Sequence, residues 1–158
     1  MNSQSFFLST ISLLIIFYSC IGKSKLPNKM PEQVEFRYGE NGGMSPYYKS
    51  IEIVGDTLTF TESAYPNDQS VKWSKKIELV DKENLYQIFV ENKFDRIKNK
   101  SKKHIVYDAG SEGASISFPG ADYHVQYGAN FPLSDKNRIR YNNVASAIQS
   151  LVSKYKSK

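Results

Sequence analysis

Apolar and polar residues alternate with a period of two in the first half of the chain, a pattern that predicts β-strands with one buried face. The segments with this alternation are residues 34–38, 48–54, 57–62 and 70–80. Only Gly55 and Asp56 separate the second segment from the third, so we expect these two to form a hairpin. In the fourth segment Lys75 interrupts the apolar side, which indicates a bulge or a strand at the sheet edge.

Apolar residues recur at spacings of three and four in two further segments, which predicts amphipathic helices. Asp81 can accept an unpaired amide hydrogen at the start of the first helix, which we expect to end near Asn92. Ser134 can cap the second helix, predicted over residues 135–155 with lysines near its end. Between the helices the alternation returns and predicts strands at 105–107, 116–118 and 123–127, with turns at 110–113 and 119–122.

The predicted order is therefore three or four strands, a helix, three strands and a second helix. Short links between consecutive strands favour antiparallel pairing. A helix with a single apolar stripe must bury that stripe against another layer. We expect one α+β domain over residues 32–158, with an antiparallel sheet of about six strands and both helices packed on one face.

Residues 1–19 have the pattern of a signal peptide rather than of a permanent membrane span. Their apolar run, residues 6–18, would form a helix of roughly 20 Å, whereas a bilayer core is about 30 Å thick. Phe17, Tyr18, Ser19 and Cys20 resemble a relaxed lipobox, in which Phe17 and Tyr18 replace the usual Leu and small residue. This resemblance implies cleavage before Cys20 and a diacylglycerol on its thiol.

The charges around this run leave one alternative open, an uncleaved anchor in which Cys20 is an ordinary apolar residue. No Lys or Arg precedes the run, whereas Lys23 and Lys25 follow it, the reverse of the positive-inside pattern of a secreted domain. Residues 20–31 have little apolar content and predict a flexible tether. Because Cys20 is the only cysteine, we expect no disulfide in the domain.

The 158 residues include 21 Lys and Arg against 16 Asp and Glu, and the resulting charge of +5 lies entirely after Cys20. Mild basicity favours acidic partners such as anionic lipid headgroups or acidic glycans, although ordinary solvated lysines are the simpler interpretation. The same two interpretations apply to a basic run formed by Lys98, Lys100, Lys102 and Lys103. Because an exported protein meets little nucleic acid, we expect no nucleic-acid partner.

His104 and His124 are the only histidines, and both have acidic neighbours. A zinc site could combine them with Asp108, Glu112 and Asp122. In an extended strand, however, His104 and Asp108 would lie about 13 Å apart, so only neighbouring strands could bring such ligands together. We expect no metal and no cofactor.

Ser111 lies in a glycine-flanked segment, residues 110–113, where a tight turn could expose a nucleophilic hydroxyl. The Gly-x-Ser-x-Gly signature of a nucleophile elbow is broken, because Ala109 stands two residues before the serine. We therefore interpret this segment as a plain β-turn.

A polar, glycine-rich segment from Gly39 to Tyr48 predicts a flexible loop, with a long hairpin connection as the alternative. Its candidate contact residues are Glu40, Asn41, Met44, Tyr47 and Tyr48. Tyrosines in or beside loops could stack on sugar rings, and these are Tyr47, Tyr48 and Tyr65. Other tyrosines alternate with apolar residues and are expected in or beside the core: Tyr38, Tyr107, Tyr123 and Tyr127.

The C-terminal third resembles small lipoproteins of Bacteroidota, a likeness that implies no particular activity. The positions that carry it are Tyr107, Asp108, Gly110, Ser111, Gly128, Phe131, Pro132 and the last helix. Surface-exported lipoproteins of that phylum often carry acidic residues just after the lipidated cysteine. Residues 21–25 have none, which favours a protein that faces the periplasm.

These features together predict a cell-envelope protein, anchored to a membrane by lipid, that acts as a non-enzymatic binding or accessory module for an envelope protein or glycan. Two alternatives stay open. The first is a hydrolase or metal enzyme whose site no motif marks. The second is a small inhibitor that inserts the Gly39 to Tyr48 loop into an envelope enzyme.

Overall fold

The computed structural model describes residues 24–63, 70–101 and 104–157. Within these residues the chain forms one six-stranded antiparallel sheet and two α-helices, so the expected α+β fold is confirmed. The strands are β1 (Glu35–Gly42), β2 (Ser45–Val54), β3 (Thr57–Ser63), β4 (Val71–Lys76), β5 (Ser111–Phe118) and β6 (Ala121–Gly128). The helical segments are α2 (Leu79–Glu91), the 3-10 helix η1 (Phe94–Arg96) and α3 (Asp135–Lys156).

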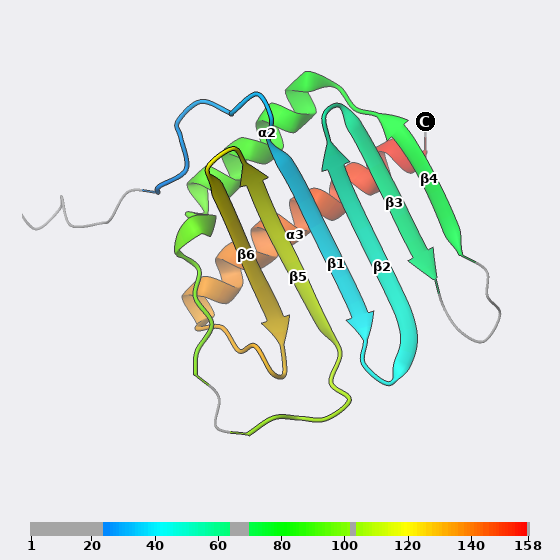
Figure 1. The fold of residues 1–158 in the computed structure, drawn as a ribbon, viewed down its shortest axis with the longest axis vertical. Helices are drawn as coiled ribbons and strands as arrows, with labels where there is room; N and C mark the ends of the chain where they lie inside the picture. The colour runs from blue at the N-terminus through cyan, green and yellow to red at the C-terminus, as the bar shows by residue number, and fades with distance from the viewer. Residues whose placement is uncertain (1–23, 64–69, 102–103, 158) are drawn as a thin grey trace, which may run out of the picture.

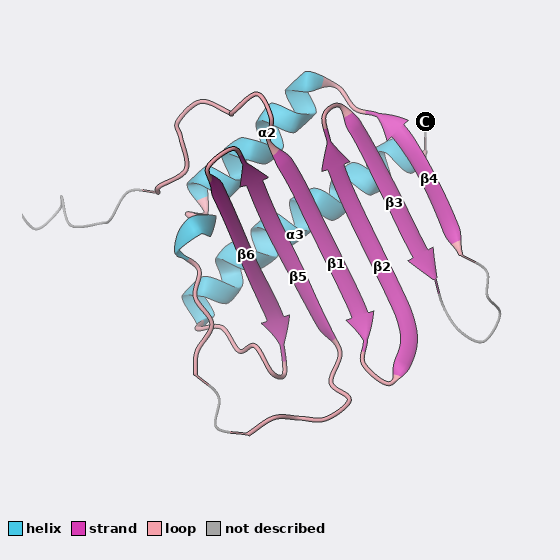
Figure 2. Ribbon diagram, viewed as in Figure 1, coloured by secondary structure: helices cyan, strands magenta, loops and turns pink. Residues whose placement is uncertain are grey.

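The strands follow the order β4-β3-β2-β1-β5-β6, so β1 lies near the middle of the sheet between β2 and β5. All five neighbouring pairs are antiparallel. The short connections predicted this for the pairs of consecutive strands, whereas β1 and β5 are far apart in the chain. Helices α2 and α3 both lie behind the sheet in Figure 1, and the face toward the viewer carries neither helix. Figure 2 shows the same two layers by type of element.

The core lies between the sheet and the helices. The ring of Phe89 on α2 lies 5.2 Å from that of Phe36 on β1 and 4.7 Å from that of Phe94 on η1. Ile148 of α3 and Leu58 of β3 are fully buried in the same cluster. Burying each side chain of this size contributes about 1.5–3 kcal/mol, so the helices are held mainly by this layer.

The helix boundaries match the predictions in part. Ser134 caps α3, because its hydroxyl accepts a hydrogen bond from the amide of Asn137 at 3.3 Å. The prediction of Asp81 as the cap of α2 is wrong, since that helix begins two residues earlier, after the extended residue Glu78. The Asp81 carboxylate instead accepts hydrogen bonds from the Lys154 ammonium group near the end of α3.

The predicted tether is also corrected for the part that the structure describes, residues 24–31. Leu26 is buried in the core, with 3% of its surface exposed. Ser24 and the amide of Lys25 donate hydrogen bonds to the Asp95 carboxylate, at 2.5 and 2.8 Å. A single leucine among polar residues gives no periodic signal, so the composition did not predict that this segment packs on the domain. The signal peptide and Cys20 lie outside the described residues.

Three predicted loops and strands differ from the structure. Residues 39–48 form no long loop, because β1 and β2 continue to a tight turn at Gly43 and Met44. Ser111 to Gly113 belong to β5 rather than to a turn, since they pair with β1. Residues 105–107 form no strand. The backbone N–H of Val106 donates a hydrogen bond to the Asn130 side-chain oxygen at 2.7 Å, and the Asn130 side-chain NH₂ donates one to the Val106 carbonyl at 2.8 Å.

The exposure of the tyrosines and the order of the strands test the remaining predictions, those for the core tyrosines and for Lys75. Tyr38 is buried and Tyr123 and Tyr127 pack against the core, as expected, whereas Tyr107 is 85% exposed. The Lys75 interruption marks an edge strand, because β4 is the outer strand of the sheet, and its pairing with β3 is regular. Tyr65 lies outside the described residues.

Candidate functional site: a groove on the open sheet face

The face of the sheet opposite the helices is polar. Strand side chains alternate between faces, so the residues between the buried positions point to this open face. Many of them carry short hydroxyl groups: Ser50, Thr57, Thr59, Thr61, Ser74, Ser111, Ser115 and Ser117. A row of short side chains leaves the backbone of the sheet close to the molecular surface.

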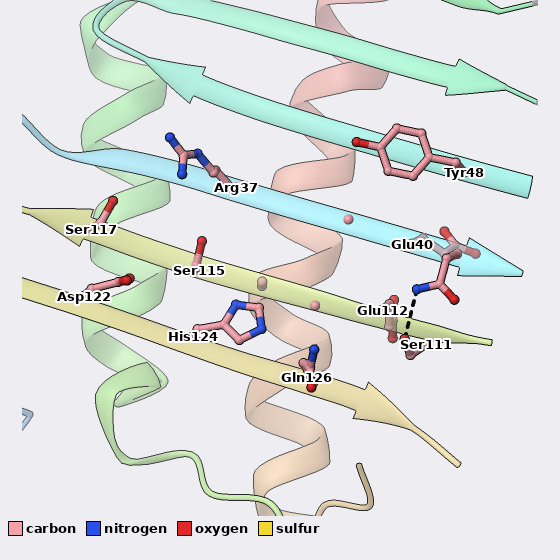
Figure 3. Close-up of a pocket in the computed structure, with 14 residues that line it drawn as sticks. Arg37, Glu40, Tyr48, Ser111, Glu112, Ser115, Ser117, Asp122, His124 and Gln126 are labelled. Atoms are coloured by element: carbon pink, nitrogen blue, oxygen red, sulfur yellow. Dashed lines mark hydrogen bonds between the residues drawn. The ribbon is translucent and has the colours of Figure 1, made fainter. Parts of the chain in front are cut away.

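A groove of about 450 Å³ crosses this face over β1, β5 and β6. Figure 3 shows Arg37 on β1, Ser115 and Ser117 on β5, and His124 on β6 around it. Its size is within the range of small-molecule sites in proteins, and most of the side chains that line it are polar. The groove therefore suits a polar ligand.

Two glycines form the floor of the groove. Gly39 of β1 and Gly113 of β5 are direct cross-strand partners, so neither strand adds a side chain at the centre of the face. Gly39 has no left-handed backbone, and a Cβ atom there would meet nothing closer than a carbonyl oxygen at 3.9 Å. Glycine inside a strand weakens it and often marks a place where a ligand approaches the backbone. Neither backbone geometry nor packing requires glycine at position 39.

The imidazole of His124 forms one wall of the groove. Its Cε1 atom lies 3.2 Å from the position that a Cβ atom of Gly113 would occupy, so the ring leans over the glycine. Gln126 is the direct partner of Gly113 on β6 and lines the groove next to it. The second glycine thus makes room for the histidine ring.

The remaining rim combines one aromatic ring with polar groups. Tyr48 of β2 is 47% exposed and lies across β1 from the groove floor (Figure 3). Asn41 donates a hydrogen bond from its amide to the Ser111 hydroxyl at 3.0 Å. Arg37 forms an ion pair with Glu35 at 2.8 Å, and its side chain is 54% exposed.

A second polar cluster lies below the groove, on the helix side of β1, β2 and β5. Tyr38 donates a hydrogen bond to Glu112, and Lys49 forms an ion pair with Glu40 at 2.6 Å. Burial and the Glu112 hydrogen bond raise the pKa of Tyr38 far above its usual value. Burial lowers the pKa of Lys49, but the hydrogen bond and charge of Glu40 raise it overall. These groups fix the strands that carry the groove.

Tyr141 of α3 adds a buried hydroxyl to this cluster. The hydroxyl has no hydrogen-bond partner among the described residues. Burial and the nearby charges of Glu112 and Glu40 raise the pKa of Tyr141 far above its usual value. The phenol therefore stays neutral in the folded protein.

The structure separates the five residues expected in a binding loop. Glu40, Asn41 and Tyr48 all belong to the groove lining, but the Glu40 carboxylate forms its ion pair with Lys49 on the helix side. Tyr47 also turns to that side and donates a hydrogen bond to Glu62 at 3.1 Å. Met44 is 76% exposed at the turn between β1 and β2. Two of the five thus contribute side chains to one surface.

The groups considered for metal or nucleophilic chemistry are also dispersed. Within the described residues, no three His, Cys, Asp or Glu side chains are close enough to hold a metal ion. His104 is exposed in the connection before β5, whereas His124 belongs to strand β6. Ser111 bonds to an amide rather than to a base.

The groove does bring Ser115 together with His124 and Asp122, two residues that the sequence had grouped only as possible zinc ligands. Ser115 and His124 are direct cross-strand partners, and Asp122 lies two residues before the histidine on the same face. Within the part of the chain that the structure describes, no hydrogen bond joins any two of these three side chains, so they do not form a catalytic triad as they stand.

In sequence, the chain matches no known protein family and no curated protein. Neither helix in residues 24–63, 70–101 and 104–157 is long and apolar enough to cross a membrane. The sequence interpretation missed Gly39, Gly113, Arg37 and Gln126 as groove residues. The signal that could have found them was the pair of glycines inside two alternating segments.

Proposed function

We propose that this protein is a lipid-anchored protein of the cell envelope that acts as a non-enzymatic binding module, with the groove on the open sheet face as its ligand site. The observation that supports this most is the glycine pair in the groove floor. Glycine at position 39 costs strand stability without a backbone or packing need, which is typical of a surface kept bare for a ligand.

The anchor of this proposal is a lipid on Cys20, with the domain facing the periplasm. Because Ser24 and Lys25 bond to Asp95, only residues 21–23 would separate the lipidated cysteine from the folded domain. Four extended steps from Cys20 to Ser24 reach roughly 14 Å at most. The domain would then lie next to the membrane surface, and its partner would be an envelope protein or glycan.

A thermal-unfolding screen tests the groove. The wild-type protein and the Gly39→Val variant are each heated with neutral oligosaccharides, acidic oligosaccharides, short peptides and fatty acids. A ligand at about ten times its Kd stabilises the folded state by about 1.4 kcal/mol. A ligand that raises the Tm of the wild type but not of the variant supports the proposal. If every stabilising ligand acts equally on both proteins, the groove is not the site.

The anchor needs a separate measurement. Mass spectrometry of the mature protein should show a chain that begins at Cys20 and carries a lipid mass on it. A chain that still begins at Met1 without modification would refute the anchor and favour the uncleaved alternative.

A hydrolase is the second candidate, and the Ser115–His124 pair is the observation that favours it. A histidine beside a serine can activate the hydroxyl as a nucleophile if a hydrogen bond forms on substrate binding. A fluorophosphonate probe would label Ser115 in such an enzyme, and His124→Ala would abolish the labelling. A wild-type protein that the probe leaves unlabelled would argue against this candidate.

A further inference from the structure

We infer that the ligand of the groove is a neutral saccharide chain. This inference rests on the proposed function, because it names the ligand class of the same groove. It is drawn from the charge balance of the lining, from its hydrogen-bonding groups, and from the shape of its floor.

The groove lining has no unpaired cation. Its one guanidinium, Arg37, is already paired with Glu35 at 2.8 Å, and its other charged residues, Glu40, Glu112 and Asp122, are acidic. Anion sites in proteins instead gather several arginines, lysines or free backbone amides around the ligand. A carboxylate or phosphate on the ligand would be repelled here, so a neutral ligand fits better than an anionic one.

The lining offers many hydrogen bonds on small, planar or hydroxyl groups. Asn41 and Gln126 each carry a donor and an acceptor side by side, and the serine hydroxyls donate and accept. Adjacent hydroxyls of a sugar ring also donate and accept in pairs, so they match such side chains. The lining has few apolar side chains for a lipid, which a fatty chain would need to bury its surface.

The floor and the Tyr48 ring supply the flat surfaces that a sugar ring requires. With no side chain at Gly39, a ring can lie directly against the peptide groups of β1, beside the His124 ring that leans over Gly113. The half-exposed ring of Tyr48 stands on the β2 side and His124 on the β6 side (Figure 3). Aromatic rings pack against the apolar faces of sugars while the polar tip stays in water.

The length of the groove favours a chain over a single sugar. Along β5 the lining extends from Ser111 to Ser117, seven residues whose six steps span about 20 Å in an extended strand. That distance accommodates several sugar units in a row. An oligosaccharide could thus use the polar groups at both ends and the bare floor between them.

Isothermal titration calorimetry tests this inference with defined probes. The full domain is titrated with cellotetraose, maltotetraose, xylotetraose and chitotetraose, and with tetragalacturonate as an acidic probe. We expect at least one neutral tetrasaccharide to bind with a Kd of about 0.1–1 mM. The Gly39→Val and Tyr48→Ala variants should each bind about tenfold more weakly or worse. Lys72→Ala on the distant edge strand is the control on the same face and should change Kd less than about twofold.

The possible results separate the ligand class from the groove itself. If only tetragalacturonate binds, and Gly39→Val abolishes its binding, the neutral-saccharide inference is wrong while the groove stands as a binding site. If a neutral tetrasaccharide binds wild type and Gly39→Val equally, the sugar site lies elsewhere and the inference fails. If no probe binds and the thermal screen finds no groove-dependent ligand, both proposals fail together.

Discussion

Gly39 and Gly113 lie opposite each other on β1 and β5, so neither position adds a side chain to the centre of a polar sheet face. The surroundings of the two glycines differ. A side chain at Gly39 would project into open space, whereas one at Gly113 would meet the ring of His124 at 3.2 Å. The pair therefore allows the bare floor of the groove to be tested without disturbing its histidine wall.

The first prediction separates stability from binding. Gly39→Val should leave the domain as stable as the wild type, or raise its free energy of unfolding by about 0.5–1 kcal/mol, because valine suits a strand better than glycine. It should nonetheless weaken ligand binding, since the new side chain fills the floor. Urea unfolding measures the first effect. A clear loss of stability would mean that Gly39 serves the fold and would remove the main argument for the groove.

The second prediction concerns the segment that joins the N-terminal chain to the domain. The Asp95 carboxylate is fully buried and accepts hydrogen bonds from Ser24 and the Lys25 amide, so Asp95→Ala should cost about 2–3 kcal/mol. It should also release residues 24–27, which limited trypsin digestion would detect as faster cleavage after Lys25. Asp122→Ala, on the exposed face, is the matched control. Equal digestion rates in both variants would show that the hydrogen bonds of Asp95 do not hold residues 24–27 on the domain.

The third prediction concerns alkaline pH. Burial raises the pKa of Tyr141 above its ordinary value of 10.0, so the folded state keeps a proton that the unfolded state loses near pH 10. The resulting stability is complete below pH 10 and is lost as the pH rises above it. Between about pH 10 and 12, the free energy of unfolding of Tyr141→Phe should therefore fall less steeply with rising pH than that of the wild type.

At neutral pH the same substitution should be nearly harmless. The Tyr141 hydroxyl is buried and finds no hydrogen-bond partner among the residues that the structure describes, so its removal should change the free energy of unfolding by less than about 1 kcal/mol. Tyr38→Phe is the contrasting variant, because it leaves Glu112 without its donor and should cost about 1–3 kcal/mol. The reverse order of stabilities, measured by urea unfolding at pH 7, would contradict this description of the cluster.

The fourth prediction tests the close contact between the β1–β2 turn and the backbone of Asp108. Gly43 has a φ of +66°, and a Cβ atom there would lie 2.2 Å from the carbonyl oxygen of Asp108. Gly43→Ala should therefore cost more than about 3 kcal/mol, through both strain and a backbone clash. Gly120→Ala, at φ +85° with open space around it, should cost only about 1–2 kcal/mol. Similar costs at both positions would show that the contact with Asp108 yields easily.

The sequence predicted the layers of this fold better than its surface. Strands such as 57–62 alternate because one side packs on helices, and that pattern is visible without a structure. Gly39 and Gly113 were misread because glycine is also the commonest signal for a turn. Their role depends on the pairing of β1 with β5, which joins residues more than seventy positions apart. No local pattern contains that register.

The N-terminal segment shows the same limit on a smaller scale. Its composition predicts a tether, and only the position of Asp95 on η1 reveals that Ser24 and Leu26 are fixed to the domain. One buried leucine contributes about 1.5–3 kcal/mol, enough to hold a short segment, yet it has no period to detect.

The most direct test of the binding groove is a ¹H–¹⁵N correlation spectrum recorded while the tetrasaccharide that binds most tightly is added. We expect shifts in the amides of Gly39, Gly113 and Gln126, and unchanged positions for residues on β4. We also expect these shifts to disappear in Gly39→Val. Shifts confined to another surface, such as the exposed residues 105–107, or the same shifts in the variant, would contradict a binding site in the groove.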